Sequence, residues 1–204
     1  MSERNTMART LHDVGLAAWF GGSLMGATGL NGAAADVDDP RQRARVANAG
    51  WSRWTPFNLA AIAAHLVGGA QLVRANRDRI AGQKGVAGMT VSKAALTGAA
   101  LGATAYSRVL GQKIMSAGDV PVAGGTSPLP TTPPEVAGAQ KQLKALQWVI
   151  PGLTGGIIGL AAYAGEQQRP SQVRKGKLGR AGQVAKGAAL AGAAKTGLTR
   201  GDDC

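Results

Sequence analysis

Four polar side chains that interrupt otherwise apolar stretches are the residues of this chain whose types could do chemistry. They are three amides and one guanidinium, namely Asn31, Asn58, Gln147 and Arg108. Surrounded by hydrocarbon, each group needs a hydrogen-bonding partner or water, so such residues mark candidate binding sites or ion pathways. Their positions predict a similar depth, and we expect one intramembrane polar layer with Arg108 at its centre. The alternative is structural, in which Arg108 extends to the membrane surface and the amides cap helix ends.

The two histidines, His12 and His65, could bind a metal ion or relay protons, with Asp13 as a third group. His12 and Asp13 stand at the entrance of one apolar stretch, whereas His65 stands near the middle of the next. These positions predict a separation of roughly half a bilayer, on the order of 15 Å, which is too far for shared ligation of haem or copper. We therefore expect no metal, no cofactor and a neutral His65 hydrogen-bonded across the bundle. Proton relay through His65 to His12 and Asp13 is the alternative.

Catalytic motifs are absent from the rest of the sequence. Neither histidine has a nucleophile in a suitable register, and no nucleotide-binding loop or metal-ligand spacing is present. The single cysteine, Cys204, excludes an intramolecular disulfide and lacks the frame that prenylation requires. The sequence predicts that this chain is not an enzyme.

Four apolar stretches rich in Gly and Ala must position these polar residues. A membrane-spanning helix needs about 20 predominantly apolar residues, and the stretches at 14–35, 56–73, 94–117 and 146–165 meet that length. With 31 glycines and 4 % aromatic residues, the 204-residue chain has little side-chain area for a soluble core. The sequence therefore predicts an all-α integral membrane bundle of four transmembrane helices. Three spans and a re-entrant segment are the alternative.

One face of the first stretch carries small residues at helical spacing. Glycines on such a face let a neighbouring helix approach closely, which favours helix association in lipid. The pairs Gly98/Gly102, Gly152/Gly156 and Gly155/Gly159 repeat the same spacing. These faces could hold one bundle together or join it to a second copy or another membrane protein. The predicted packing residues of the first stretch are Gly15, Trp19, Gly22, Gly26 and Gly29.

The positive charges predict how the chain is oriented. The net charge is +12, and most of the 23 Lys and Arg residues lie at the N-terminus, between the second and third stretches, and after the fourth. Because cytoplasmic segments collect such residues, we expect a multi-pass protein of the plasma (inner) membrane with both termini in the cytoplasm. The first apolar run exceeds the about 7 to 15 residues of a signal peptide. We therefore expect an uncleaved first span, with cleavage near Ala33 to Ala35 as the alternative.

Four parts make up the predicted domain organisation: three transmembrane helices in 1–117, an outer loop at 118–138, the fourth helix at 139–165 and a tail at 166–204. The loop is rich in proline and is expected to be extended or disordered. The tail is basic and is expected to be disordered in the cytoplasm. It lacks the aromatic residues that accompany nucleic-acid binding. Binding of nucleic acid is therefore not expected. The residues predicted to contact anionic lipid headgroups are Arg174, Lys175, Lys177 and Arg180.

Residues 12–22, with the sequence HDVGLAAWFGG, contain a histidine followed at fixed spacing by Trp19, Gly21 and Gly22. This segment resembles the H-x-x-x-x-x-x-W-x-G-G entry of small multi-span bacterial proteins of the copper-resistance-D-like group and of related four-span families. The resemblance covers one of the four stretches. It implies a helical bundle in a bacterial inner membrane and a role in handling copper or another small solute. The chain differs from that group in having two histidines and no Met-x-x-Met run.

Two classes of function follow from these patterns. The first is a non-enzymatic integral membrane protein, a scaffold or accessory subunit whose basic tail binds lipid or a partner. The alternative is a membrane protein that handles a small solute, a metal or protons through polar residues within the bundle. The sequence favours the first class because its ionisable groups are not predicted to converge at one depth. The membrane itself and a second copy of the chain are the expected partners.

Overall fold

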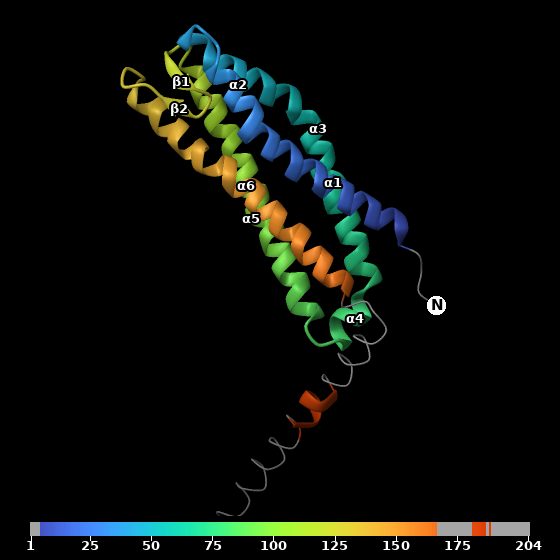
Figure 1. The fold of residues 1–204 in the computed structure, drawn as a ribbon. Helices are drawn as coiled ribbons and strands as arrows, with labels where there is room; N and C mark the ends of the chain where they lie inside the picture. The colour runs from blue at the N-terminus through green and yellow to red at the C-terminus, as the bar shows by residue number, and fades with distance from the viewer. Residues whose placement is uncertain (1–4, 167–180, 187, 189–204) are drawn as a thin grey trace, which may run out of the picture.

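A computed structural model of the chain describes residues 5–166, 181–186 and 188. Most of the described residues are helical, which confirms the all-α class (Figure 1). A short helix, α4, connects α3 to α5, and two short strands precede α6. The elements are α1 (Thr6–Met25), the π-helical segment η1 (Gly26–Leu30), α2 (Asn31–Ala35), α3 (Pro40–Ala75), α4 (Arg77–Gly82), α5 (Val86–Ser116), β1 (Val122–Gly124), β2 (Ser127–Pro128) and α6 (Pro134–Glu166).

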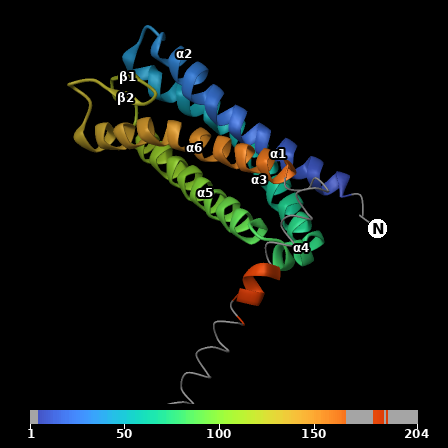
Figure 2. The same ribbon diagram turned by 60° about the horizontal axis from the view of Figure 1, so that its bottom comes forward.

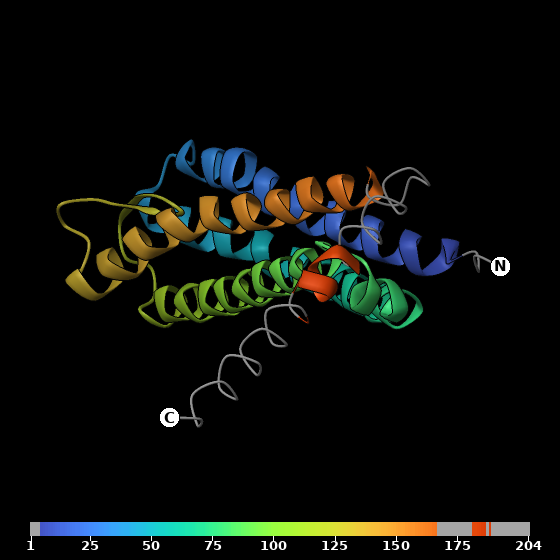
Figure 3. The same cartoon turned by 90° about the horizontal axis from the view of Figure 1, so that it is seen from below.

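Four long helical segments lie side by side in the described part of the chain: α1 with η1 and α2, then α3, α5 and α6 (Figures 2 and 3). Helix α1 packs along α3, α5 packs along α6, and α1 also contacts α6. Successive segments run in opposite directions. The start of α1, helix α4 and the end of α6 therefore lie at one end, which we call the α4 end (Figure 1). Residues 36–39 and the two strands lie at the other, the hairpin end.

Among the described residues, two helices, α3 and α6, are long and apolar enough to cross a membrane by length and composition. Only 17 % of the residues are buried in the most apolar 18-residue window of α3, and 22 % in that of α6. The core helix of a soluble protein buries most of such a window. Large apolar side chains instead point outward, including Phe57 and Val67 on α3 and Trp148 and Val149 on α6.

Helix α3 begins 16 residues before the predicted second span because its sequence carries a strong start signal. Pro40 occupies the first turn, where no backbone donor is needed, and the Asp39 carboxylate accepts a hydrogen bond from the Arg41 backbone N–H at 2.9 Å. The helix continues through Pro56. Thr55 donates its hydroxyl to the Trp51 carbonyl at 2.8 Å next to this proline. Much of the segment between the first and second predicted spans, residues 36–55, is therefore helical.

The proline-rich segment differs from the expected extended or disordered loop. Strands β1 and β2 pair in antiparallel orientation, with Val122 opposite Pro128. Val122 is fully buried and belongs to an apolar cluster with Leu110, Ile114 and Val136. The Thr132 hydroxyl donates to the Pro121 carbonyl at 2.6 Å. The segment contains extended strands but is ordered, because one buried valine and these local hydrogen bonds hold it against the helix ends.

A second apolar cluster lies midway along the helices, and we call it the middle layer. It consists of Trp19 from α1, Ile62 from α3, Ala100 from α5 and Ile150 from α6. Trp19 is fully buried, and its indole N–H donates to the Thr104 hydroxyl at 3.2 Å. All four long segments thus contribute to one cross-section of the core, which separates the polar groups of the two ends.

Candidate functional site

The α1–α3 contact sets the register of the polar residues, and glycines make it close. A Cβ atom at Gly15 would meet the backbone of Ala61 and His65, and one at Gly68 would meet the backbone of Ala8 and His12. The two helices therefore touch backbone to backbone at these points, which only glycine permits.

The other predicted packing residues behave in two ways. Gly22 lies against the indole ring of Trp54, and Gly26 lies against that of Trp51, so each glycine receives an aromatic side chain instead of a backbone. The prediction that Gly29 packs against a neighbouring helix was wrong, because the one residue near its Cβ position is Met25 of the same helical segment. The reason is the π-helical segment, whose wider turn moves Gly29 out of phase with the face that Gly22 and Gly26 share.

The glycine pairs outside the first stretch contribute less than expected. Gly155 contacts Phe20, and Gly156 contacts Leu96. Four other members of the predicted pairs have open space where a Cβ would be, so they do not pack against a neighbouring helix among the described residues. These four are Gly98, Gly102, Gly152 and Gly159.

A cavity of about 400 Å³ lies between the helices at the hairpin end, and we call it the hairpin-side cavity. Three tryptophans, Trp19, Trp51 and Trp54, form part of its wall. Hydroxyl groups of Thr55, Thr104, Ser107 and Thr126 also line it. The cavity brings together all four residues of the predicted polar layer, which come from α2, α3, α5 and α6: Asn31, Asn58, Arg108 and Gln147.

Two of these four residues bond directly to each other. Asn31 donates its amide N–H to the Gln147 side-chain oxygen at 2.8 Å, and it accepts the indole N–H of Trp51 at 3.2 Å. Arg108 is half-buried and donates from Nη1 to the Ser52 hydroxyl at 3.3 Å. The Oδ1 atom of Asn58 is buried and has no hydrogen-bond partner among the described residues.

Sequence reasoning missed Trp51 as a member of this site because this residue lies between the predicted spans at 14–35 and 56–73. The available signal was spacing, since Trp51, Thr55 and Asn58 follow one another by four and three residues. Extending the second helix toward its N-terminus would have placed these three on one face.

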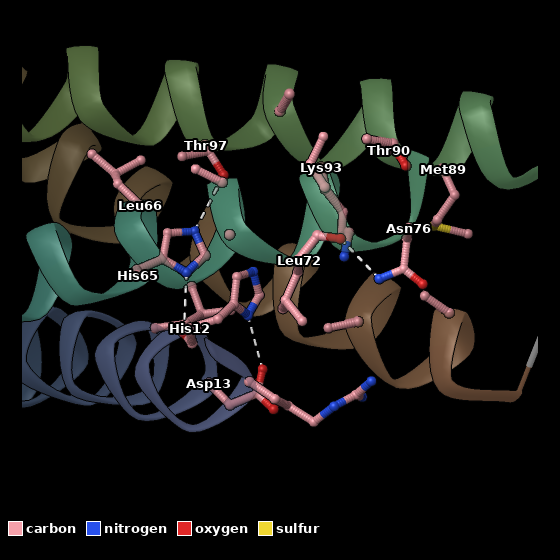
Figure 4. Close-up of a pocket in the computed structure, with 18 of the residues that line it drawn as sticks. His12, Asp13, His65, Leu66, Leu72, Asn76, Met89, Thr90, Lys93 and Thr97 are labelled. Atoms are coloured by element: carbon pink, nitrogen blue, oxygen red, sulfur yellow. Dashed lines mark hydrogen bonds and ion pairs between the residues drawn. The ribbon is translucent and has the colours of Figure 1, made fainter. Parts of the chain in front are cut away.

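A second cavity, of about 800 Å³, lies at the α4 end, and we call it the α4-side cavity (Figure 4). Most of its wall is apolar. Its polar side chains include His12 and Asp13 from α1, His65 from α3 and Lys93 from α5. All four long helices and α4 contribute to the lining.

The two histidines are neighbours, which corrects the predicted separation of about 15 Å. Their ring centroids lie 4.3 Å apart. His12 Nδ1 lies 2.8 Å from a carboxylate oxygen of Asp13, and the two ring nitrogens of His65 contact the His12 carbonyl at 3.2 Å and the Thr97 hydroxyl at 3.4 Å (Figure 4). The prediction failed because α1 begins at Thr6 and packs against α3 in a particular register. The position of a residue within its own apolar stretch does not reveal that register.

The arrangement of His12, Asp13 and His65 also bears on metal binding. Among the residues that the structure describes, no group of three or more His, Cys, Asp or Glu side chains could hold a metal ion.

Basic side chains dominate the charge of the α4-side cavity, which is lined by Arg9, Arg79 and Lys93 against the single carboxylate of Asp13. Arg79 donates to the side-chain oxygens of Gln83 at 3.2 Å and Asn76 at 3.1 Å. Burial, followed by the nearby charge of Arg9, lowers the pKa of Arg79. Lys93 precedes the third apolar stretch. Its pKa is also lowered, chiefly by burial, with Asp13 acting in the opposite sense.

Sequence reasoning counted these cations only as the positive flank of the membrane spans. The predicted lipid-headgroup cluster, Arg174, Lys175, Lys177 and Arg180, lies outside the described residues. Comparisons of the chain with models of protein families, with curated proteins and with solved structures found no match.

Proposed function

We propose that this chain is an integral membrane protein that binds a small organic anion in the hairpin-side cavity. This function belongs to the alternative class, the handling of a small solute by polar residues within the bundle. The observation that carries it is the meeting of Asn31, Asn58, Arg108 and Gln147 at one cavity of about 400 Å³. Such a volume lies at the lower end of ligand pockets, which span about 300 to 1,000 Å³.

The membrane part of the proposal is supported by the outward faces of α3 and α6. Their apolar side chains are exposed, and contact of such large apolar surfaces with water is unfavourable. Helices α1 and α5 pack along these two and would cross with them, which makes four spans. We propose the inner membrane as the location, with both termini in the cytoplasm, since the cations cluster on the segments assigned to that side.

The chemistry of the ligand is inferred from three features of the hairpin-side cavity. The Arg108 guanidinium can form a charge-assisted pair with a carboxylate. The buried Oδ1 of Asn58 needs a hydrogen-bond donor, which a ligand hydroxyl or water would supply. The indole rings of Trp51 and Trp54 offer flat apolar walls to a planar body. The probe that combines these features is 4-hydroxybenzoate.

Calorimetric titration of the purified full-length protein with 4-hydroxybenzoate tests the proposal. We expect saturable binding that Arg108→Gln weakens about tenfold, because one charge-assisted bond is lost. The uncharged analogue 4-hydroxybenzamide should bind more weakly and should be indifferent to Arg108→Gln. Arg53→Gln is the matched control, since Arg53 is an exposed arginine on α3 outside the cavity lining.

Two results would contradict the proposed function. One is the absence of saturable binding of 4-hydroxybenzoate to the wild-type protein. The other is an equal loss of affinity in Arg108→Gln and Arg53→Gln, which would mean that net charge and not the cavity attracts the anion. The scaffold class depends on the basic tail and stays a prediction.

A further inference from the structure

The α4-side cavity is large and mostly apolar. Its volume is about 800 Å³, against about 400 Å³ for the hairpin-side cavity. Leu16 from α1, Leu101 from α5 and Ile158 from α6 are among its apolar lining residues. A hollow with such walls favours an apolar body, because contact with water is unfavourable on both sides.

One part of the same cavity is positively charged. Arg9, Arg79 and Lys93 line it, and the one lining carboxylate, Asp13, is bonded to His12 at 2.8 Å. Figure 4 shows Lys93 extending from α5 toward Asn76 and Leu72 on the facing wall. Within the part of the chain that the structure describes, no ion pair involves Lys93. Burial of an ammonium is unfavourable, and Asp13 is the one lining carboxylate that acts against this cost. An oxyanion placed beside Lys93 would offset more of it.

We infer that the α4-side cavity is a second binding site, which takes a single-chain amphiphile with an oxyanion at one end. The carboxylate or phosphate of the amphiphile lies against Lys93, with Arg9 and Arg79 close by. Its apolar chain occupies the region lined by Leu16, Leu101 and Ile158. This site is separate from the hairpin-side cavity, because the middle layer with the buried Trp19 and Ile150 stands between them.

The wall of the cavity also contains a glycine where a Cβ atom meets no neighbour. Gly98 lines the cavity on α5 and has open space where a Cβ would be. A leucine there adds bulk at the cavity wall, and leucine favours helix formation over glycine. Gly102, one turn further along the same helix, is equally open but is not part of the lining of either cavity. Gly98→Leu and Gly102→Leu therefore form a matched pair.

The test is native mass spectrometry of the full-length protein in an uncharged detergent, with palmitate as the probe. We expect one palmitate per chain. Lys93→Met should weaken palmitate binding about tenfold through loss of a charged hydrogen bond, whereas Lys113→Met, an exposed lysine on the same helix, should leave it unchanged. Gly98→Leu should abolish the palmitate complex, and Gly102→Leu should retain it.

Two further probes separate the two halves of the inferred ligand. Hexadecyltrimethylammonium has the same chain and the opposite charge, and it should not bind. Inorganic phosphate has the oxyanion without the chain, and it should not displace palmitate. Palmitate bound equally by the Gly98→Leu and Gly102→Leu proteins would overturn the inference. So would equal binding of the cationic chain, or displacement of palmitate by phosphate at comparable concentrations. The titration with 4-hydroxybenzoate should be unchanged by Gly98→Leu, which keeps the two sites distinguishable.

Discussion

Single side chains at the hairpin end connect segments that are far apart in sequence. Asn31 uses both sides of its amide, donating to Gln147 on α6 and accepting from Trp51 on α3. An amide is suited to this place because it carries a donor and an acceptor on one short side chain. Loss of either partner would leave a polar group without a bond in a mostly apolar surrounding.

We predict that Asn31→Leu lowers the free energy of unfolding by about 1 to 3 kcal/mol, because the Trp51 indole N–H loses its acceptor and the Gln147 side-chain oxygen keeps only the longer bond from Thr126. Gln147→Leu should cost a similar amount, and the double variant should cost less than the sum of the two. The measurement is a double-mutant cycle from denaturant unfolding in detergent. Gln112→Leu, at an exposed position of α5, is the control. Strict additivity would show that the bond between Asn31 and Gln147 contributes nothing.

Lys93 yields a prediction on the pH dependence of stability. Its pKa in the folded protein is lower than the ordinary value of 10.5, chiefly because of burial. Between these two values the unfolded chain binds more protons than the folded one, so the free energy of unfolding rises with pH. Lys93→Met should remove this contribution, and Lys113→Met should keep it. Unfolding curves of the wild type and both variants, recorded from neutral pH up to the ordinary lysine value of 10.5, would reveal the difference. Parallel profiles for the wild type and Lys93→Met would contradict the prediction.

At the scale of elements, the register between α1 and α3 decides which polar groups meet. Gly15 and Gly68 allow these helices to touch, and the contact brings His12 beside His65. The π-helical segment then turns the rest of the first stretch, so that Asn31 reaches α6. At the same end, the buried Gln140 donates to the Gly124 carbonyl at 2.8 Å and holds the hairpin against α6.

Substitution of the contact glycines should separate the two helices. Gly15→Ala and Gly68→Ala would each place a methyl group against backbone atoms of the partner helix, and we expect a loss of about 1 to 3 kcal/mol in the free energy of unfolding. Gly21→Ala should be neutral or slightly stabilising, since open space surrounds Gly21. Thermal unfolding of the three variants in detergent gives the comparison. If all three unfold at the same temperature, the close contact between α1 and α3 is not formed.

Considered as a whole molecule, the chain has two chemically different ends. The α4 end contains Arg9, Arg79 and Lys93 around a large apolar cavity, whereas the hairpin end contains a smaller cavity with amides and tryptophans. Cations retained on one side of a membrane would produce this asymmetry. The proposed orientation therefore places the α4 end in the cytoplasm and the hairpin outside.

Cysteine labelling in intact cells checks this orientation. In a Cys204→Ser background, Thr131→Cys at the exposed hairpin end should react with a membrane-impermeant maleimide from outside. Asp78→Cys on α4, where the native side chain is 96 % exposed, should react only after the membrane is permeabilised. The reverse pattern would invert the orientation. Reaction of both cysteines only after permeabilisation would place the two ends on the same side and exclude the proposed crossing.

The sequence by itself determined the helical class and which residues were worth following. Apolar stretches and helical spacing are local properties, and they indicated α-helices and the convergence of Asn31, Asn58, Arg108 and Gln147 at one depth. The start signal of α3 at Asp39 and Pro40 is also a local property, but it was overlooked because residues 36–55 were treated as a connection between two spans.

Only the tertiary structure decided which groups touch across helices. The 4.3 Å separation of His12 and His65 depends on how far α1 slides along α3, and no local pattern encodes that distance. The hairpin is ordered because Val122 is buried among residues from α5 and α6. That burial exists only when those two helices are packed together. The gathering of Arg9, Arg79 and Lys93 at one cavity likewise requires three segments to meet. Long-range packing free energy sets all three arrangements, so composition and periodicity alone could not predict them.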